Sequence, residues 1–222
     1  GVLYNLAAAG VSIWDYNNTY VEPTVFVGAG TELLPGTVLR GTTSIADGCT
    51  IGPNSYLENV KVGEGTKVNA SQIYNSSVGY DTHVGPFAYI RPGSNVGNCV
   101  RVGDFVEIKN SNVSDGTKIS HLTYVGDSDV GKNINFGCGT VTVNYDRSKK
   151  YRTVIEDNAF IGCNTNLIAP VRVYCCGVYD HRRYSRDGAF HCARPAAEQE
   201  GLGKQTQAQG KISCIQTAPA VE

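Results

Sequence analysis

Side chains able to transfer a proton lie close together near the middle of this chain. Glu107, His121 and Tyr124 fall within one short stretch, and an imidazole oriented by a carboxylate is a suitable general base near neutral pH. A histidine in a β-rich sequence is also commonly a surface or turn residue, so the residue types alone leave both interpretations open. His83, in Asp-Thr-His-Val-Gly, has no comparable neighbours, and we interpret it as structural.

A hexad repeat would position these residues. Aliphatic residues recur about every six positions from Val21 to Phe136 and return from Ile155 to Val173, and glycine follows many of them. A period of six fits neither an amphipathic helix nor an alternating strand. It predicts an all-β solenoid in which three short strands and three tight turns form one coil, stabilised by stacking on its neighbours. The anchors include Val27, Leu33, Leu39, Ile45, Ile51, Leu57, Val62, Val68, Ile73, Val78, Val84, Ile90, Val96, Val102, Ile108, Val113, Ile119, Val125 and Val130.

The repeat predicts which polar side chains lie above one another. Residues three hexads apart should stack about 4.8 Å apart, which pairs Arg91 with Lys109 and Glu107 with Tyr124. Two cations at that spacing repel each other unless an anion lies between them, and phosphate suits both groups. Alternatively, the two basic side chains are solvated and turn away from each other. The spacing leaves both possibilities open.

Three segments follow from where the hexads run. Residues 1–19 precede them, residues 20–173 contain them, and residues 174–222 are an irregular tail rich in Arg, Gln, Ala and Cys. Within the repeats, residues 144–153 form a polar, basic excursion, and such excursions often carry function.

Composition narrows the class of protein. The net charge of -1 across 222 residues gives no reason to expect nucleic acid or an anionic membrane as partner, and no apolar run approaches the roughly 20 residues that span a bilayer. The 8 cysteines are scattered or crowded into the tail, without the paired spacing of a zinc site. We therefore expect a reduced, cytoplasmic protein without a bound metal.

Several strings in this order resemble one known family. They are Val84-Gly-Pro-Phe-Ala-Tyr-Ile-Arg-Pro-Gly93, Gly103-Asp-Phe-Val-Glu-Ile-Lys-Asn110, Ser120-His-Leu-Thr-Tyr-Val-Gly-Asp127, Gly131-Lys-Asn-Ile-Asn-Phe-Gly137, Val143-Asn-Tyr-Asp146 and Leu167-Ile-Ala-Pro-Val171. Together they resemble the C-terminal acetyltransferase domain of the bifunctional N-acetylglucosamine-1-phosphate uridyltransferase/glucosamine-1-phosphate acetyltransferase, a hexapeptide-repeat transferase. The resemblance implies a left-handed parallel β-helix.

The resemblance also implies a role for each matching residue. His121 would be the base that takes a proton from the C2 amine of glucosamine 1-phosphate, with Glu107 orienting it or balancing its charge. The amine would then attack acetyl-CoA directly. The remaining roles are phosphate binding by Arg91, Lys109 and Lys150, sugar contacts by Tyr124, Asn135 and Asn144, and an acetyl-CoA side formed by Cys138, Tyr145 and Cys163.

Further expectations concern assembly and the two ends of the chain. The family implies a homotrimer with shared sites and a product that feeds nucleotide-sugar and cell-envelope synthesis. Residues 1–19 resemble the helical linker to the uridyltransferase half, whose nucleotide loop does not occur here. Cys138 and Cys163 stand where the family usually has alanine and serine. The tail, including Cys175, Cys176, His181 and His191, departs from the family, and our hypothesis for it is a segment read out of frame rather than a metal site.

Three other functions fit parts of the sequence. A γ-class carbonic anhydrase shares the fold but needs three histidines, whereas the repeats contain only His83 and His121. A sugar-nucleotide acyltransferase would use a histidine base too, but the basic trio favours a terminal sugar phosphate. A catalytically impaired trimerisation fragment of the same enzyme stays an open alternative.

Overall fold

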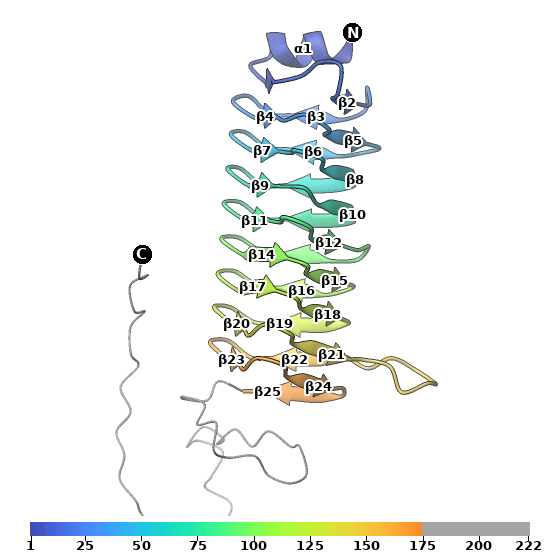
Figure 1. Cartoon of the computed structure of the whole chain (residues 1–222), viewed down its shortest axis with the longest axis vertical. Coiled ribbons are helices and arrows are strands. Elements are labelled where there is room, and N and C mark those ends of the chain that lie inside the picture. The colour runs from blue at the N-terminus through green and yellow to red at the C-terminus, as the bar shows by residue number, and fades with distance from the viewer. Residues whose placement is uncertain (175–222) are drawn as a thin grey trace, which may run out of the picture.

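The computed structural model describes residues 1–174 as a short helix followed by a stack of parallel coils (Figure 1). No helix in this part of the chain is both long and apolar enough to cross a membrane. The elements are α1 (Val2–Ala8), β1 (Ser12–Ile13), β2 (Tyr20–Val21), β3 (Phe26–Val27), β4 (Glu32–Leu33), β5 (Val38–Arg40), β6 (Ser44–Ile45), β7 (Thr50–Ile51), β8 (Tyr56–Val62), β9 (Lys67–Val68), β10 (Gln72–Val78), β11 (His83–Val84), β12 (Tyr89–Ile90), β13 (Asn95–Val96), β14 (Arg101–Asp104), β15 (Glu107–Lys109), β16 (Asn112–Val113), β17 (Lys118–His121), β18 (Tyr124–Gly126), β19 (Ser128–Val130), β20 (Asn135–Phe136), β21 (Val141–Val143), β22 (Thr153–Ile155), β23 (Phe160–Ile161), β24 (Asn166–Ile168) and β25 (Val171–Val173).

Each strand pairs in parallel with its counterpart in a neighbouring coil of the described part of the chain. One face of the prism is the sheet β1-β4-β7-β9-β11-β14-β17-β20-β23. The other two faces include the limbs β12-β15-β18-β21-β24 and β13-β16-β19-β22-β25, which are continuous with each other through β10, because that strand pairs with both β12 and β13. This is the left-handed parallel β-helix predicted from the repeat and the family resemblance.

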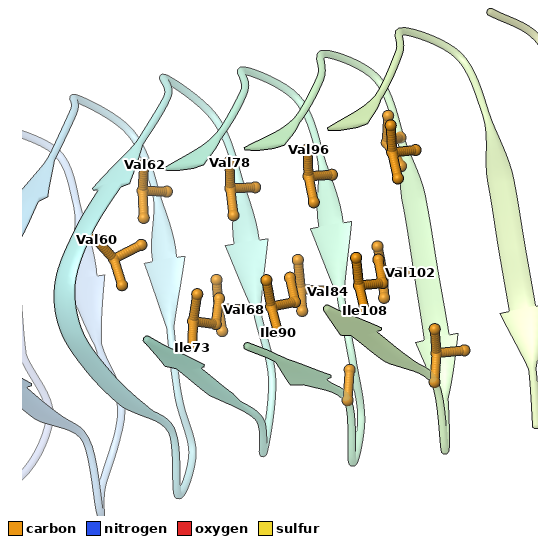
Figure 2. Packing of buried hydrophobic residues seen from close by; sticks show 14 of the residues in the cluster. Val60, Val62, Val68, Ile73, Val78, Val84, Ile90, Val96, Val102 and Ile108 are labelled. Atoms are coloured by element: carbon orange, nitrogen blue, oxygen red, sulfur yellow. The ribbon is translucent and has the colours of Figure 1, made fainter. Parts of the chain in front are cut away.

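The hexad anchors form three columns of buried side chains inside the prism. One column contains Ile73, Ile90 and Ile108, and Figure 2 shows it beside the columns of Val62, Val78 and Val96 and of Val68, Val84 and Val102. All nine residues are buried, and Ile73, Ile90 and Ile108 are 0% exposed. Because one aliphatic residue per strand points inward, the residues on either side of it point outward, where they can bind ligands.

The coils turn sharply at corners where residues adopt a left-handed backbone conformation. Phe105 and Leu122, one coil apart, have φ values of 56° and 44°, which side chains of this size rarely adopt. Gly103 lies just before the first of these corners, and a Cβ there would overlap the carbonyl oxygen of Ser120 in the next coil. Only glycine therefore lets the two coils approach this closely.

The predicted linker segment, residues 1–19, contains a helix and the first strand. Within residues 1–19 the helix covers Val2–Ala8, while β1 already pairs with β4 through Ser12 and Glu32. At the other end, β25 closes the described part of the chain, so the interpretations placed on residues 175–222, including the cysteines and histidines there, lie outside the described residues.

The excursion at residues 144–153 leaves the prism between β21 and β22 and projects sideways from it (Figure 1). The coil resumes in register, with Val130 of β19 paired with Ile155 of β22. The excursion therefore lengthens one coil without shifting the columns of the core.

Candidate functional site

His121 lies at one corner of the prism, beside a carboxylate from the preceding coil. The parallel ladder between β14 and β17 pairs Asp104 with His121, and His121 Nδ1 lies 2.7 Å from Asp104 Oδ1. This contact is the main cause that lowers the pKa of Asp104, so the carboxylate stays ionised. His121 remains exposed to solvent. The arrangement is an imidazole held by an acidic partner, with its other ring nitrogen available to a ligand.

The acidic partner differs from the predicted one. Glu107 pairs in register with Tyr124, as the repeat predicted, but its carboxylate accepts a hydrogen bond from Arg91 Nη1 at 2.8 Å. The predicted role of Glu107 in orienting His121 therefore has no contact in this chain to support it, and Asp104 makes that contact instead.

A face of the prism runs from the His121 corner along β12, β15 and β18. The register of Ile90 with Ile108 places Arg91 beside Lys109, and Lys109 pairs with Gly126 of the next coil. The Tyr124 side chain lies across Gly126, because a Cβ on that glycine would overlap the Tyr124 hydroxyl. The phenol is thereby held next to the position of Lys109.

The excursion brings a second lysine to this face. Lys150 contacts the Lys109 side chain, and this contact, followed by burial, lowers the pKa of Lys109, to which the charge of Arg91 also contributes. The two lysines thus repel each other in the absence of an anion. A cluster of three cations on one face is the arrangement expected of a site for a doubly charged oxyanion.

A buried carboxylate lies at the far corner of the same face. Asp127 is 6% exposed and accepts hydrogen bonds from Asn110 Nδ2 at 2.5 Å and from the Asn144 side-chain amide. The charge of Asp127 raises the pKa of Lys109, whereas Lys150 lowers it. Asp127 therefore fixes Asn144 at the point where the excursion begins and partly offsets the repulsion among the cations.

The excursion is fastened to the prism at its far end as well. Arg152 donates from Nε to Asp129 Oδ2 at 2.8 Å and from Nη2 to the Ser128 carbonyl oxygen at 2.9 Å. Between the two ends, the Tyr145 hydroxyl donates to the Arg147 carbonyl oxygen at 2.7 Å, and an isolated bridge joins Tyr145 to Lys150. These contacts hold Lys150 over the face.

The remaining predicted residues lie on the His121 side. Asn135 pairs with Lys118 and with Phe160, on the same sheet as Asp104 and His121. Cys138 and Cys163 lie at equivalent positions in consecutive coils, each two residues after the paired anchors Phe136 and Ile161. The Asn164 amide donates to the Cys138 carbonyl oxygen at 2.7 Å. Cys138 is half-buried and Cys163 is exposed.

The structure thus divides the predicted residues between two neighbouring regions. Arg91, Glu107, Lys109 and Tyr124 share one face with the excursion, whereas His121 lies at the corner that separates this face from the sheet carrying Asn135. Sequence reasoning missed Asp104, Asp127 and Arg152. The repeat contains the signal for Asp104. Val102 and Ile119 are equivalent anchors, and Asp104 and His121 each lie two residues after their anchor, so the two side chains are expected to stack.

Within the described residues there is no group of three or more His, Cys, Asp or Glu side chains placed to hold a metal ion. The charged groups that form the site are the three cations, the two carboxylates beside them and the His121–Asp104 pair.

The stacked hexads form a parallel β-helix with a histidine at one corner and cations on the adjoining face. The chain matches the C-terminal region of the bifunctional GlmU proteins, which confirms the resemblance predicted from the sequence. It is 52% identical over 164 residues to GlmU of Clostridioides difficile (strain 630), 51% identical over 164 residues to that of Brevibacillus brevis and 54% identical over 164 residues to that of Clostridium botulinum (strain Langeland). In each case the match covers 74% of this chain and 36% of the relative, so the chain spans only about a third of these proteins.

No protein-family model matches the chain. Among solved structures, the UDP-N-acetylglucosamine O-acyltransferase (LpxA) of Moraxella catarrhalis RH4 is 15% identical with a TM-score of 0.30, over 68% of this chain and 63% of that one.

Proposed function

We propose that this chain transfers the acetyl group of acetyl-CoA to the C2 amine of glucosamine 1-phosphate, giving N-acetylglucosamine 1-phosphate. The observation that carries the proposal is the meeting of Lys109 and Lys150 beside Arg91, on the face that adjoins His121. An amino sugar 1-phosphate carries its anion and its amine on adjacent carbons, so it presents both features that such a site can bind.

The terminal phosphate is the part of the acceptor that the cations would hold. A phosphate dianion between Lys109 and Lys150 replaces their repulsion by two attractions, and Arg91 adds a planar group suited to phosphate oxygens. Tyr124, Asn135 and Asn144 would contact the sugar. This assignment explains why an excursion from the prism is held so firmly at Asn144 and Arg152.

The reaction needs one base and no covalent enzyme intermediate. The neutral amine attacks the thioester carbonyl carbon, a C–N bond forms, and the C–S bond to CoA breaks. The proton lost by the nitrogen passes to Nε2 of His121 and then to the departing CoA thiolate, which leaves as the free thiol. Acetyl-CoA and the amine are thus converted to an amide and a thiol, with atoms and charge in balance.

Assembly and donor binding complete the proposal. Tyr145, Cys138 and Cys163 would face acetyl-CoA, and the exposed His121 corner would be covered by a neighbouring subunit in a homotrimer. The enzyme would work in the cytoplasm, where its product would supply nucleotide-sugar and cell-envelope synthesis. The similarity to GlmU over 74% of the chain supports each of these assignments.

The decisive experiment offers the purified chain acetyl-CoA together with either glucosamine 1-phosphate or glucosamine 6-phosphate. Mass spectrometry of the product is the preferred readout, because exposed cysteines such as Cys163 react with thiol reagents. Acetylation of the 1-phosphate, with at least about tenfold lower turnover of the 6-phosphate, is expected. Equal turnover of the two would contradict the proposed phosphate site, and the absence of turnover by an intact trimer would contradict the proposed activity.

A further inference from the structure

Asp104 and His121 occupy equivalent positions in consecutive coils. Each is the last residue of its strand, β14 or β17, and the two are paired in the parallel ladder. Besides the 2.7 Å contact between His121 Nδ1 and Asp104 Oδ1, the Leu122 amide donates to the Asp104 carbonyl oxygen at 3.0 Å. The side-chain contact is therefore built into the register of the solenoid.

The backbone around the pair leaves little freedom for other arrangements. Phe105 and Leu122, which follow the two residues, both adopt positive φ, so each corner turns in the same way. Gly103, which precedes Asp104, is the residue that permits close approach to Ser120 in the next coil. Bulky residues in this conformation are costly and persist where the surrounding structure enforces them.

We propose that Asp104 is the positioning residue of the base: it fixes the imidazole of His121 as the tautomer with hydrogen on Nδ1 and directs Nε2 outward. The proposal rests on the acetyl transfer proposed above and adds a residue to it.

The chemistry of the pair supports this assignment. An ionised carboxylate can only accept hydrogen bonds, so the nitrogen beside it must carry the hydrogen. The other nitrogen, Nε2, then keeps its lone pair and can take the proton of the attacking amine. As the imidazolium forms, its positive charge is held beside the Asp104 carboxylate.

Other charged or titratable groups around His121 do not offer the same contact. Glu107 is engaged by Arg91 at 2.8 Å. Lys118 lies on the same strand as His121 and pairs with Arg101. The charge of Arg101 helps to lower the pKa of Asp104. Cys138 lies at the corresponding corner of the following coil and offers a thiol rather than a carboxylate.

The test compares Asp104→Asn with Glu107→Gln and with Asp81→Asn. Asp81 is an aspartate at a different corner, between β10 and β11, and lies outside the site. Its positive φ is a conformation that asparagine tolerates well. Asp104→Asn should lower kcat about tenfold to a hundredfold, less than loss of the base itself, with the KM values for acceptor and donor changed no more than about threefold. Asp81→Asn should match the unmodified protein.

A spectroscopic readout separates positioning from simple structural support. In ¹⁵N-histidine spectra, His121 is assigned by the signal missing from His121→Ala, and the unmodified protein should show hydrogen on Nδ1. Asp104→Asn should show a mixture of the two tautomers, because an amide can donate as well as accept.

The outcomes also separate this inference from the proposed function. Unchanged kcat and an unchanged tautomer in Asp104→Asn would overturn the positioning role while leaving acetyl transfer in place. A larger loss of kcat and the tautomer change in Glu107→Gln would likewise overturn it in favour of Glu107. The unmodified protein could instead fail to acetylate glucosamine 1-phosphate while Asp104→Asn still changes the His121 tautomer. That result would support the positioning role of Asp104 and contradict the proposed reaction.

Discussion

The side chain of Lys150, on the excursion, meets that of Lys109, on the face of the prism, and the meeting lowers the pKa of Lys109. Two lysines brought together by a segment fastened at both ends form a site whose own charges oppose one another. Such a site gains most when an anion binds, because binding removes the repulsion as well as adding attraction.

Replacing Lys150 by alanine should therefore weaken acceptor binding. We expect the KM for glucosamine 1-phosphate to rise by about tenfold to a hundredfold, the range of a charge-assisted hydrogen bond worth about 1.5–3 kcal/mol, with a smaller change in kcat. Lys149→Ala is the matched control, since the Lys149 ammonium lies 4.9 Å from the centre of the Tyr151 ring. Equal effects of the two substitutions on KM would contradict a specific phosphate contact by Lys150.

Replacing His121 by alanine should abolish turnover while leaving the fold unchanged. A general base contributes roughly 10²–10⁴-fold to rate, and His121 is exposed at a corner, so its loss should change the free energy of unfolding by no more than about 0.5 kcal/mol. Product formation and sedimentation of the variant measure the two effects. His83→Ala, an exposed histidine on β11, should retain activity. An active His121→Ala variant would remove the assignment of the base.

Replacing Ile108 by alanine should destabilise the prism at the level of the site. Ile108 is 0% exposed, and deleting a buried isoleucine to alanine costs about 2–5 kcal/mol. Ile108→Val should cost only about 0.5–1.5 kcal/mol. Urea unfolding at one fixed protein concentration checks both values, since assembly would make stability depend on concentration. Similar stabilities of the two variants would show that this column is less tightly packed than described.

The attachment of the excursion should depend on pH through Asp129. The hydrogen bond from Arg152 is the main cause that lowers the pKa of Asp129. A carboxylate with a lowered pKa stabilises the folded state above its ordinary pKa of about 4, and this contribution is lost as pH falls through the lower, folded-state value. The two side chains are 41% and 45% exposed, so the effect should stay below about 1 kcal/mol.

Arg152→Gln tests this expectation by thermal unfolding between about pH 2 and about pH 7. The variant should unfold at a lower temperature than the unmodified protein above about pH 4, and the difference should vanish in acid. Arg147→Gln removes a neighbouring charge from the same excursion and serves as control, because the Arg147 contact with Tyr145 uses only its backbone carbonyl. A difference that persists in acid would mean that Arg152 acts mainly through the Ser128 carbonyl.

The hexads predicted the fold and part of the site because periodicity fixes register. Once Ile90 and Ile108 are recognised as equivalent, the pairing of Glu107 with Tyr124 and the placing of Arg91 beside Lys109 follow from counting. The same counting applied to His121 leads to Asp104, whereas closeness in the sequence and the family resemblance both favour Glu107.

Contacts of the excursion could not be predicted in this way. Its residues follow no repeat, so the meeting of Lys150 with Lys109 and the bonds from Asp127 to Asn144 depend on how an irregular segment folds back. Arg152 likewise reaches Asp129 through a side-chain contact that no spacing rule anticipates. Long-range side-chain contacts of this kind are determined by three-dimensional packing rather than by period.

Because the chain returns into register after the excursion, the excursion and the solenoid can change in sequence independently of each other. A step of one coil spans 17 residues between Asn112 and Asp129 but 25 between Lys132 and Asp157, yet the ladder on either side is continuous. Insertions or deletions within the excursion would therefore alter what the site recognises without disturbing the frame that carries the base. Substrate preference can therefore change through the excursion alone, while the solenoid and the position of His121 stay the same.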